Sequence, residues 1–132
     1  MRDKFADSNI LLYLFSEDQI KKEIAFRIFN QHPVITLQVI GENLNVCLRN
    51  FKFTYDRALE HTRELEKNCE VKSTSMATIE SALYLSKRYK YSFWDCMILA
   101  SALENNCTVV YSEDMQHHQV IEKKLKIVNP FI

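Results

Sequence analysis

The sequence predicts an α/β fold in which a short central parallel sheet is flanked by helices. Short apolar runs, often β-branched, alternate with longer segments whose apolar residues recur every three or four positions. Strands that alternate with helices require crossover connections, and these make neighbouring strands parallel. One glycine and two prolines leave little material for hairpin turns or flexible linkers. We therefore expect the 132 residues to form one domain, residues 1–132.

Five short strands are expected, and residues 108–111 give the clearest signal because they are β-branched or aromatic. The first strand is short and leads directly into the acidic residue Asp7. The expected strands are residues 4–6, residues 33–36, a brief segment at Val71, residues 108–111 and residues 125–128.

Helices are expected between these strands. In the clearest one, large apolar residues follow one another at intervals of three or four and fall on one stripe. The residues of this stripe are Leu37, Ile40, Leu44, Leu48 and Phe51. The expected helices cover residues 10–15, 18–30, 37–51, 54–68, 75–89 and 93 to about 106.

Composition narrows the functional classes. The 17 Lys and Arg residues balance 17 Asp and Glu residues, so no overall basic field drives nonspecific binding of nucleic acid. Neutrality does not exclude RNA, because an acidic metal site would mask a basic rim. No apolar run approaches the ~20 residues of a membrane span, and the N-terminus lacks a secretory signal pattern. The four cysteines lie in apolar stretches without a CxxC pair, so we expect reduced thiols in a cytoplasmic protein without membrane association.

Four acidic residues are candidates for one site: Asp7, Glu42, Asp95 and Asp114. Ligand sites of open α/β sheets form beyond the carboxyl ends of the strands. Asp7 ends the first expected strand, and Asp114 closely follows the fourth. The alternative for Asp7 is a helix N-cap, and the alternative for Asp114 is an ordinary turn residue.

Asp95 lies in a helix that is apolar on almost every side, so we expect its carboxylate to be largely withdrawn from water. An ionised group in such a place needs a partner, a hydrogen bond or a metal. An equally supported alternative is a capping box, in which Asp95 reaches back to the amide of Ser92.

Glu42 is expected to border apolar surface beside Val39 and Val46; the alternative is an ordinary solvated glutamate. The adjacent Gly41 costs about 1 kcal/mol in a helix relative to Ala, which suggests that another group approaches the backbone closely. Taken together, the four acids are most easily satisfied by a shared cation, and ligands that are all oxygen suit Mg²⁺ or Mn²⁺.

Other motifs give weaker signals. His117 and His118 lack further ligands at zinc spacing and are expected in an exposed loop. The sequence contains no GxGxxG motif, P-loop or nucleophile elbow.

In five segments, taken in order, the chain resembles the PIN-domain family, most closely the VapC-type toxins of type II toxin–antitoxin pairs. These segments are residues 5–13, 38–44, 91–95, 111–116 and 128–131. One departure is His117-His118, where relatives often carry a short turn with Asp and Gly. The resemblance implies a PIN-like three-layer sandwich.

The same resemblance implies an endoribonuclease that depends on Mg²⁺ or Mn²⁺. It is usually a homodimer and is held inactive by a cognate antitoxin. The family's acids match Asp7, Glu42, Asp95 and Asp114. Asp7, Asp95 and Asp114 would hold the metal, and Glu42 would orient the attacking water. Asn9 and Ser112 match positions of supporting hydrogen-bond partners. RNA contacts are expected from cations near the cleft, although a solvated charged face is an equally good interpretation of each. These cations are Arg49, Lys52, Lys87, Arg88 and Lys90.

Two rival functions remain. A phosphatase of the haloacid-dehalogenase type also places an Asp after its first strand, but it requires a second Asp two positions later, where this chain has Asn9. A module that keeps the fold and only binds a partner is the non-enzymatic rival, and the presence of all four acids argues against it.

Overall fold

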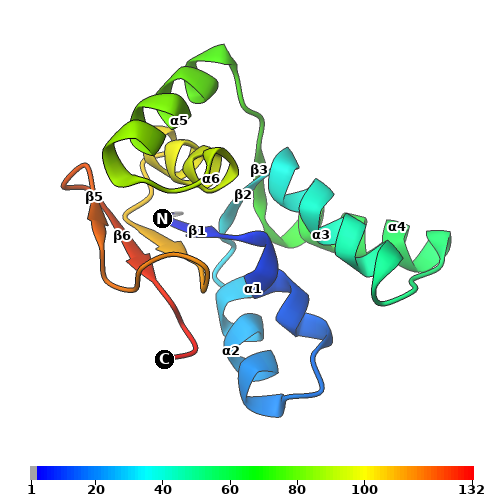
Figure 1. Ribbon diagram of the computed structural model, residues 1–132. Coiled ribbons are helices and arrows are strands. Elements are labelled where there is room, and N and C mark those ends of the chain that lie inside the picture. Colours follow the sequence, from blue (N-terminus) through cyan, green and yellow to red (C-terminus); the bar gives the residue numbers. More distant parts are fainter. Residues whose placement is uncertain (1–2) are drawn as a thin grey trace.

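A six-stranded sheet lies at the centre of the computed structural model, which describes residues 3–132 (Figure 1). The strand order is β3-β2-β1-β4-β6-β5. The strands are β1 (Lys4–Ala6), β2 (Val34–Thr36), β3 (Glu70–Lys72), β4 (Val109–Tyr111), β5 (Val120–Ile121) and β6 (Leu125–Val128). All neighbouring pairs are parallel except β5 and β6. The expected α/β fold is confirmed, with one antiparallel strand at the edge.

Helices flank the sheet. They are α1 (Ser8–Leu12), a 3₁₀ helix η1 (Tyr13–Phe15), α2 (Gln19–Phe29), α3 (Leu37–Arg49), α4 (Tyr55–Asn68), α5 (Met76–Tyr89) and α6 (Phe93–Glu104). Figure 1 shows α5 and α6 together on one side of the strands, α1 and α2 on the other, and the α3–α4 pair extending away from the sheet. Among the described residues, no helix combines the length and apolar character needed to cross a membrane.

Strand β5 was not expected from the sequence. Its connection to β6 is a tight hairpin in which Glu122 and Lys123 adopt left-handed backbone angles, with φ of 52° and 61°. Hairpin turns of this kind usually contain Gly or Asn, because other residues pay a steric cost there. The expectation that a chain with one glycine forms few hairpins is therefore wrong at this position.

Helix α6 contributes more residues to the core than any other element. Residues 96–102 of α6 are all buried, as the apolar sequence of this helix predicts. The sheet contributes fully buried side chains such as Phe5, Ile35 and Ile127. The four cysteines are free and buried, as expected.

Helix α3 is present as predicted, but its buried face is not its apolar stripe. The buried residues are Val39, Asn43 and Cys47, whereas Leu37 and Leu48 are 62% and 47% exposed. The helix packs against α1 and α4 through its smaller residues. The polar Asn43 can be buried there because hydrogen bonds satisfy its amide.

Candidate active site

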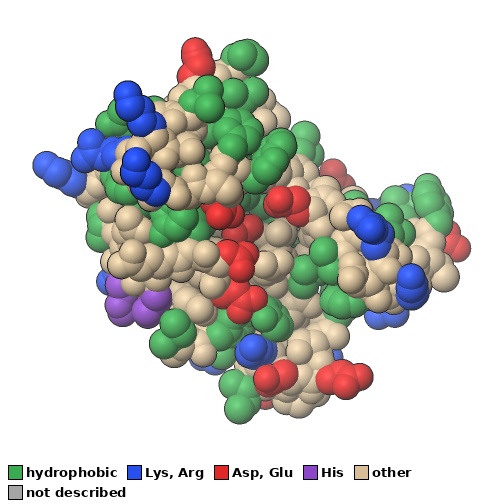
Figure 2. Space-filling model, in the orientation of Figure 1, with side chains coloured by type: hydrophobic (Ala, Val, Ile, Leu, Met, Phe, Trp, Pro, Cys, Tyr) green, Lys and Arg blue, Asp and Glu red, His purple; other side chains and the backbone are tan. Residues whose placement is uncertain are grey.

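One cleft brings together all four predicted acids. It has a volume of about 290 Å³ and lies at the carboxyl ends of β1 and β4. Figure 2 shows acidic side chains gathered in a hollow at the centre of one face. The lining residues are Asp7, Ser8, Asn9, Glu42, Asn45, Val46, Trp94, Asp95, Ile98 and Asp114.

Asp7 is the buried member of the group, with 6% of its surface exposed. It follows β1 and is also the N-cap residue of α1, as the capping alternative predicts. Its carboxylate accepts hydrogen bonds from the Ser8 amide at 2.7 Å and from the Ser112 hydroxyl at 3.1 Å. Burial nevertheless raises its pKa to about 6, and the negative charges of Glu42 and Asp114 act in the same direction.

Asp114 lines the same cleft and is exposed. The side-chain amide of Asn9 donates a hydrogen bond to Asp114 Oδ2 at 2.7 Å. The hydroxyl of Ser112 accepts from the Asp114 amide at 3.2 Å while it donates to Asp7. The two predicted supporting residues, Asn9 and Ser112, therefore contact the predicted metal ligands directly.

Glu42 extends from α3 toward the same cleft. Partial burial of its carboxyl group raises its pKa, hydrogen bonds from Gln38 and Ser8 lower it, and Asp95 and Asp114 raise it further. The residue itself is exposed, as the alternative of a solvated glutamate predicts, and it lines the cleft together with Val46. The interpretation of Gly41 is wrong. Within residues 3–132, apart from its chain neighbours and the backbone of its own helix, no atom would lie within 4 Å of a Cβ built on this glycine.

Asp95 is only half-buried, so the expectation that its carboxylate is largely withdrawn from water is wrong. It lies in the first turn of α6, which emerges from the core at the cleft. The Ser92 hydroxyl accepts from the Asp95 amide at 3.2 Å, which supplies the first half of the proposed capping box. Burial raises the pKa of Asp95, and the Ser92 hydroxyl lowers it. Asp95 therefore lines the cleft beside a capped helix start.

A buried polar network supports the turn that carries Asp7. The Asn43 side-chain amide donates to the Ser8 carbonyl at 3.2 Å, and His61 Nε2 lies 2.6 Å from Asn43 Oδ1. Because Oδ1 can only accept, Nε2 of His61 carries the proton. The sequence pattern did not single out this network, since its members lie on α1, α3 and α4.

The predicted RNA-binding cations do not enter the cleft. Arg49, Lys52, Lys87, Arg88 and Lys90 are all exposed, and none of them lines it. Figure 2 shows the basic side chains mostly toward the edges of the same face, away from the acidic centre.

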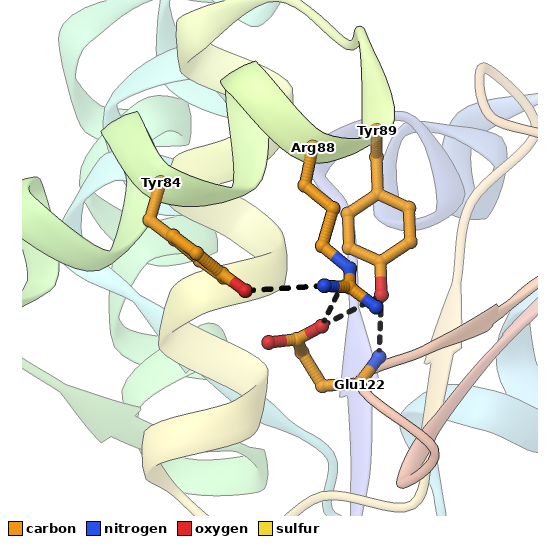
Figure 3. Close-up of polar contacts among 4 residues, drawn as sticks. All are labelled: Tyr84, Arg88, Tyr89 and Glu122. Atoms are coloured by element: carbon orange, nitrogen blue, oxygen red, sulfur yellow. Dashed lines mark hydrogen bonds and ion pairs between the residues drawn. The ribbon is translucent and has the colours of Figure 1, made fainter.

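Arg88 has its own acidic partner. Its Nε lies 3.3 Å from Glu122 Oε2, and its Nη1 donates to the Tyr84 hydroxyl at 3.2 Å (Figure 3). The Tyr89 hydroxyl donates to the same Glu122 oxygen at 2.7 Å. These contacts tie α5 to the β5–β6 hairpin.

The histidine pair fits the expected loop only in part. His118 is exposed, but His117 is half-buried and its Nδ1 accepts from the Asn129 amide at 2.9 Å. The two rings stack with their centroids 3.6 Å apart. His117 thus has a structural contact with the C-terminal segment.

The donor atoms of the cleft suit a hard divalent cation. Four carboxylates converge there, and the pKa of Asp7 is raised partly by its acidic neighbours. Within residues 3–132, no three Asp, Glu, His or Cys side chains are already arranged as a metal-ligand cluster. Mg²⁺ retains several waters and binds through few carboxylates, so it does not require such a cluster.

Comparison with known proteins identifies the family and the fold. A family model described as PIN domain matches residues 4–123. A search of curated proteins gives no significant match.

Two solved structures share the fold. A toxin–antitoxin complex from Klebsiella pneumoniae has a TM-score of 0.74 at 21% identity, and the match covers 96% of this chain and 97% of that chain. VapC20 from Mycobacterium tuberculosis, described as a Sarcin-Ricin loop cleaving toxin, has a TM-score of 0.66 at 19% identity. This second match covers 84% of this chain and 89% of that chain.

Proposed function

The chain belongs to the PIN domain family. We propose that it is a divalent-metal-dependent endoribonuclease and the toxin of a toxin–antitoxin pair. The observation that carries the proposal is the convergence of Asp7, Glu42, Asp95 and Asp114 in one cleft. The two structures of similar fold are described as a toxin that cleaves the Sarcin-Ricin loop and as a toxin–antitoxin complex, which supports the toxin assignment.

Asp7, Asp95 and Asp114 would hold Mg²⁺ or Mn²⁺. A bound divalent cation would supply positive charge that neutralises the phosphate and makes a nearby water more acidic. Hydrogen bonds from Ser112 and Asn9 orient the carboxylates of Asp7 and Asp114, respectively. Both carboxylates would therefore be oriented before substrate binds.

Glu42 would orient the attacking water and accept its proton at the carboxylate. A general base works best when its pKa lies near the working pH, and both burial and the neighbouring carboxylates raise the pKa of Glu42. Hydrogen bonds from Gln38 and Ser8 hold its carboxylate at the cleft.

The proposal includes two protein partners that the family resemblance implies. A cognate antitoxin would inhibit the enzyme by occupying the cleft, and the active form would be a homodimer. Co-expression with the product of an adjacent small reading frame, followed by size-exclusion chromatography with light scattering, would test both.

The rival functions have distinct signatures. A phosphatase of the aspartyl-phosphate type requires a free acid two positions after Asp7, but the side chain of Asn9 is an amide that donates to Asp114. A binding module without activity would bind a partner tightly and show no metal-dependent cleavage of any RNA.

Cleavage of RNA by the purified chain tests the proposal. Wild-type protein should cleave in Mg²⁺ and stop in EDTA. The Asp7→Asn and Asp95→Asn variants should lose at least about a hundredfold in rate, because each removes one charged ligand. Asp56→Asn is a matched control, since Asp56 is exposed on α4 and does not line the cleft. Unchanged cleavage by both cleft variants would refute the assignment.

A further inference from the structure

Trp94 forms an exposed aromatic surface inside the acidic cleft. It lies in the first turn of α6, beside Asp95, and 60% of its surface is exposed. Residues 96–102 of the same helix are buried. The helix therefore exposes its largest apolar side chain at the cleft, where Trp94 is a lining residue together with the four acids.

Trp94 has one ring contact and one backbone contact. The ring of Phe93 meets its indole edge-on, with centroids 5.2 Å apart and planes at 72°. The side-chain amide of Gln38 donates to the Trp94 carbonyl at 3.4 Å, and the same side chain hydrogen-bonds Glu42. Gln38 therefore connects the backbone of Trp94 to one of the four acids.

Within residues 3–132, the lining of the cleft offers no basic side chain to the phosphates of RNA. None of its lining residues in the described part of the chain is Lys or Arg. Its carboxylates repel phosphate until a cation neutralises them, and ion pairs with side chains cannot supply the remaining attraction. Aromatic side chains bind nucleic acid without charge, because every nucleobase has a face on which a ring can stack.

We propose that Trp94 is a base-stacking residue that receives an unpaired nucleobase next to the phosphate at the cation-loaded cleft. Bases inside a duplex already stack on one another, and only splayed bases of single strands, loops or bulges offer a free face. Stacking on Trp94 therefore requires that the base beside the cleaved bond is unpaired. This inference rests on the proposed nuclease function.

A protein partner is the competing occupant. Leu37, Met76 and Leu83 are also exposed, and Figure 2 shows apolar side chains beside the acidic hollow. The proposed antitoxin would cover Trp94 when it occupies the cleft, but it would then also obstruct the acids and prevent turnover. A cleft that must admit a phosphate chain favours the nucleotide as the ligand of this ring during turnover.

Fluorescence offers a direct test, because Trp94 is the single tryptophan of the chain. Metal-loaded Asp7→Asn protein would be titrated with a short single-stranded RNA, with the same RNA in a duplex, and with versions carrying one abasic position. Stacking predicts quenching by the single strand, little response to the duplex, and loss of quenching when one particular base is missing. If the Asp7→Asn variant binds metal too weakly, wild-type protein in Ca²⁺ replaces it.

Kinetics supply the second readout. Trp94→Ala should raise KM about 5- to 150-fold with a much smaller change in kcat, because stacking binds substrate and transition state alike. Trp94→Phe should recover part of the loss. Tyr55→Ala is the matched control, since Tyr55 is 76% exposed but lies on α4 outside the cleft. Thermal unfolding of each variant identifies any that fails to fold.

The outcomes separate this inference from the nuclease proposal. Cleavage by wild-type protein together with an unchanged KM for Trp94→Ala and no RNA-dependent quenching would overturn the stacking role alone. Absence of cleavage under all conditions would refute the nuclease, while base-dependent quenching would still support a stacking site. A fluorescence change that follows protein concentration instead of RNA would assign Trp94 to an interface between copies and overturn the proposal.

Discussion

At the scale of the single residue, Asp7 lies where an ionised carboxylate is costly. Burial raises its pKa from 3.8 to about 6, and the hydrogen bonds from Ser8 and Ser112 offset only part of this effect. Two further acids add repulsion. Such a residue destabilises the metal-free fold at neutral pH, and a bound cation would remove this penalty.

We therefore expect Asp7→Asn to stabilise the metal-free protein at neutral pH. The folded state holds the Asp7 proton more tightly than the unfolded state, so the free energy of unfolding falls as pH rises from about 4 to about 6. The loss amounts to about 2–3 kcal/mol above this range. The variant has no ionisable group at this position, so it should lack the contribution of Asp7 to this slope. Urea unfolding in EDTA across the pH range would measure it, and parallel profiles for the two proteins would contradict the expectation.

The sequence identifies the polar residues of the site more accurately than it predicts how deeply each residue is buried. Asp7 and Asp114 could be placed because strand ends define an edge of the sheet. Asp95 was expected to be buried, because helical periodicity does not reveal that the first turn of α6 emerges into the cleft. The exposure of Trp94 was missed for the same reason.

At the scale of the element, left-handed backbone positions are occupied by residues other than glycine. Lys90 is an example: it ends α5 with φ of 68° and ψ of 21°, and its amide donates to the Ser86 carbonyl. Helices commonly end in this conformation, but the position is usually glycine because a Cβ is strained there. The only glycine of the chain lies instead in α3, where its backbone is helical.

Lys90→Gly should stabilise the protein by about 1 kcal/mol, because it relieves this strain at the end of α5. Lys90→Ala keeps the Cβ and should show no gain, which separates backbone strain from the loss of charge. Chemical denaturation of the three proteins gives the comparison. Equal stabilisation by both substitutions would point to charge rather than to the backbone.

Most helices and strands could be predicted to within a few residues because their apolar periodicity is strong. The exceptions have physical reasons. Strand β5 has two residues and a turn without glycine or asparagine, so neither its length nor its turn gives a signal. In α3 the spacing of the large apolar side chains predicts that these side chains are buried. The face that packs against α1 and α4 instead carries smaller side chains, including Asn43.

At the scale of the whole molecule, strand order assembles the site. β1 and β4 are neighbours, with Ala6 paired to Tyr111, so the residues that follow them meet although they are 105 positions apart in the sequence. The α3 and α6 helices then add Glu42 and Asp95. This neighbourhood follows from crossover topology, which a sequence of alternating strands and helices suggests but does not specify.

The distribution of charge also belongs to this scale. The sequence is neutral overall, yet acids line the cleft and the exposed cations lie outside it. The sequence could show the balance of charges but not their separation. The predicted roles of these cations in RNA binding stay predictions, and a steep dependence of binding on salt would support them.

The central claim is that Asp7, Asp95 and Asp114 bind a divalent cation in the cleft. Calorimetric titration of metal-free protein with Mn²⁺ tests it most directly. Wild-type protein and Asp56→Asn should bind alike, and Asp7→Asn and Asp114→Asn should each weaken binding by at least about tenfold. Binding that is equal in all four proteins, or absent from wild-type protein with and without RNA, would contradict the claim.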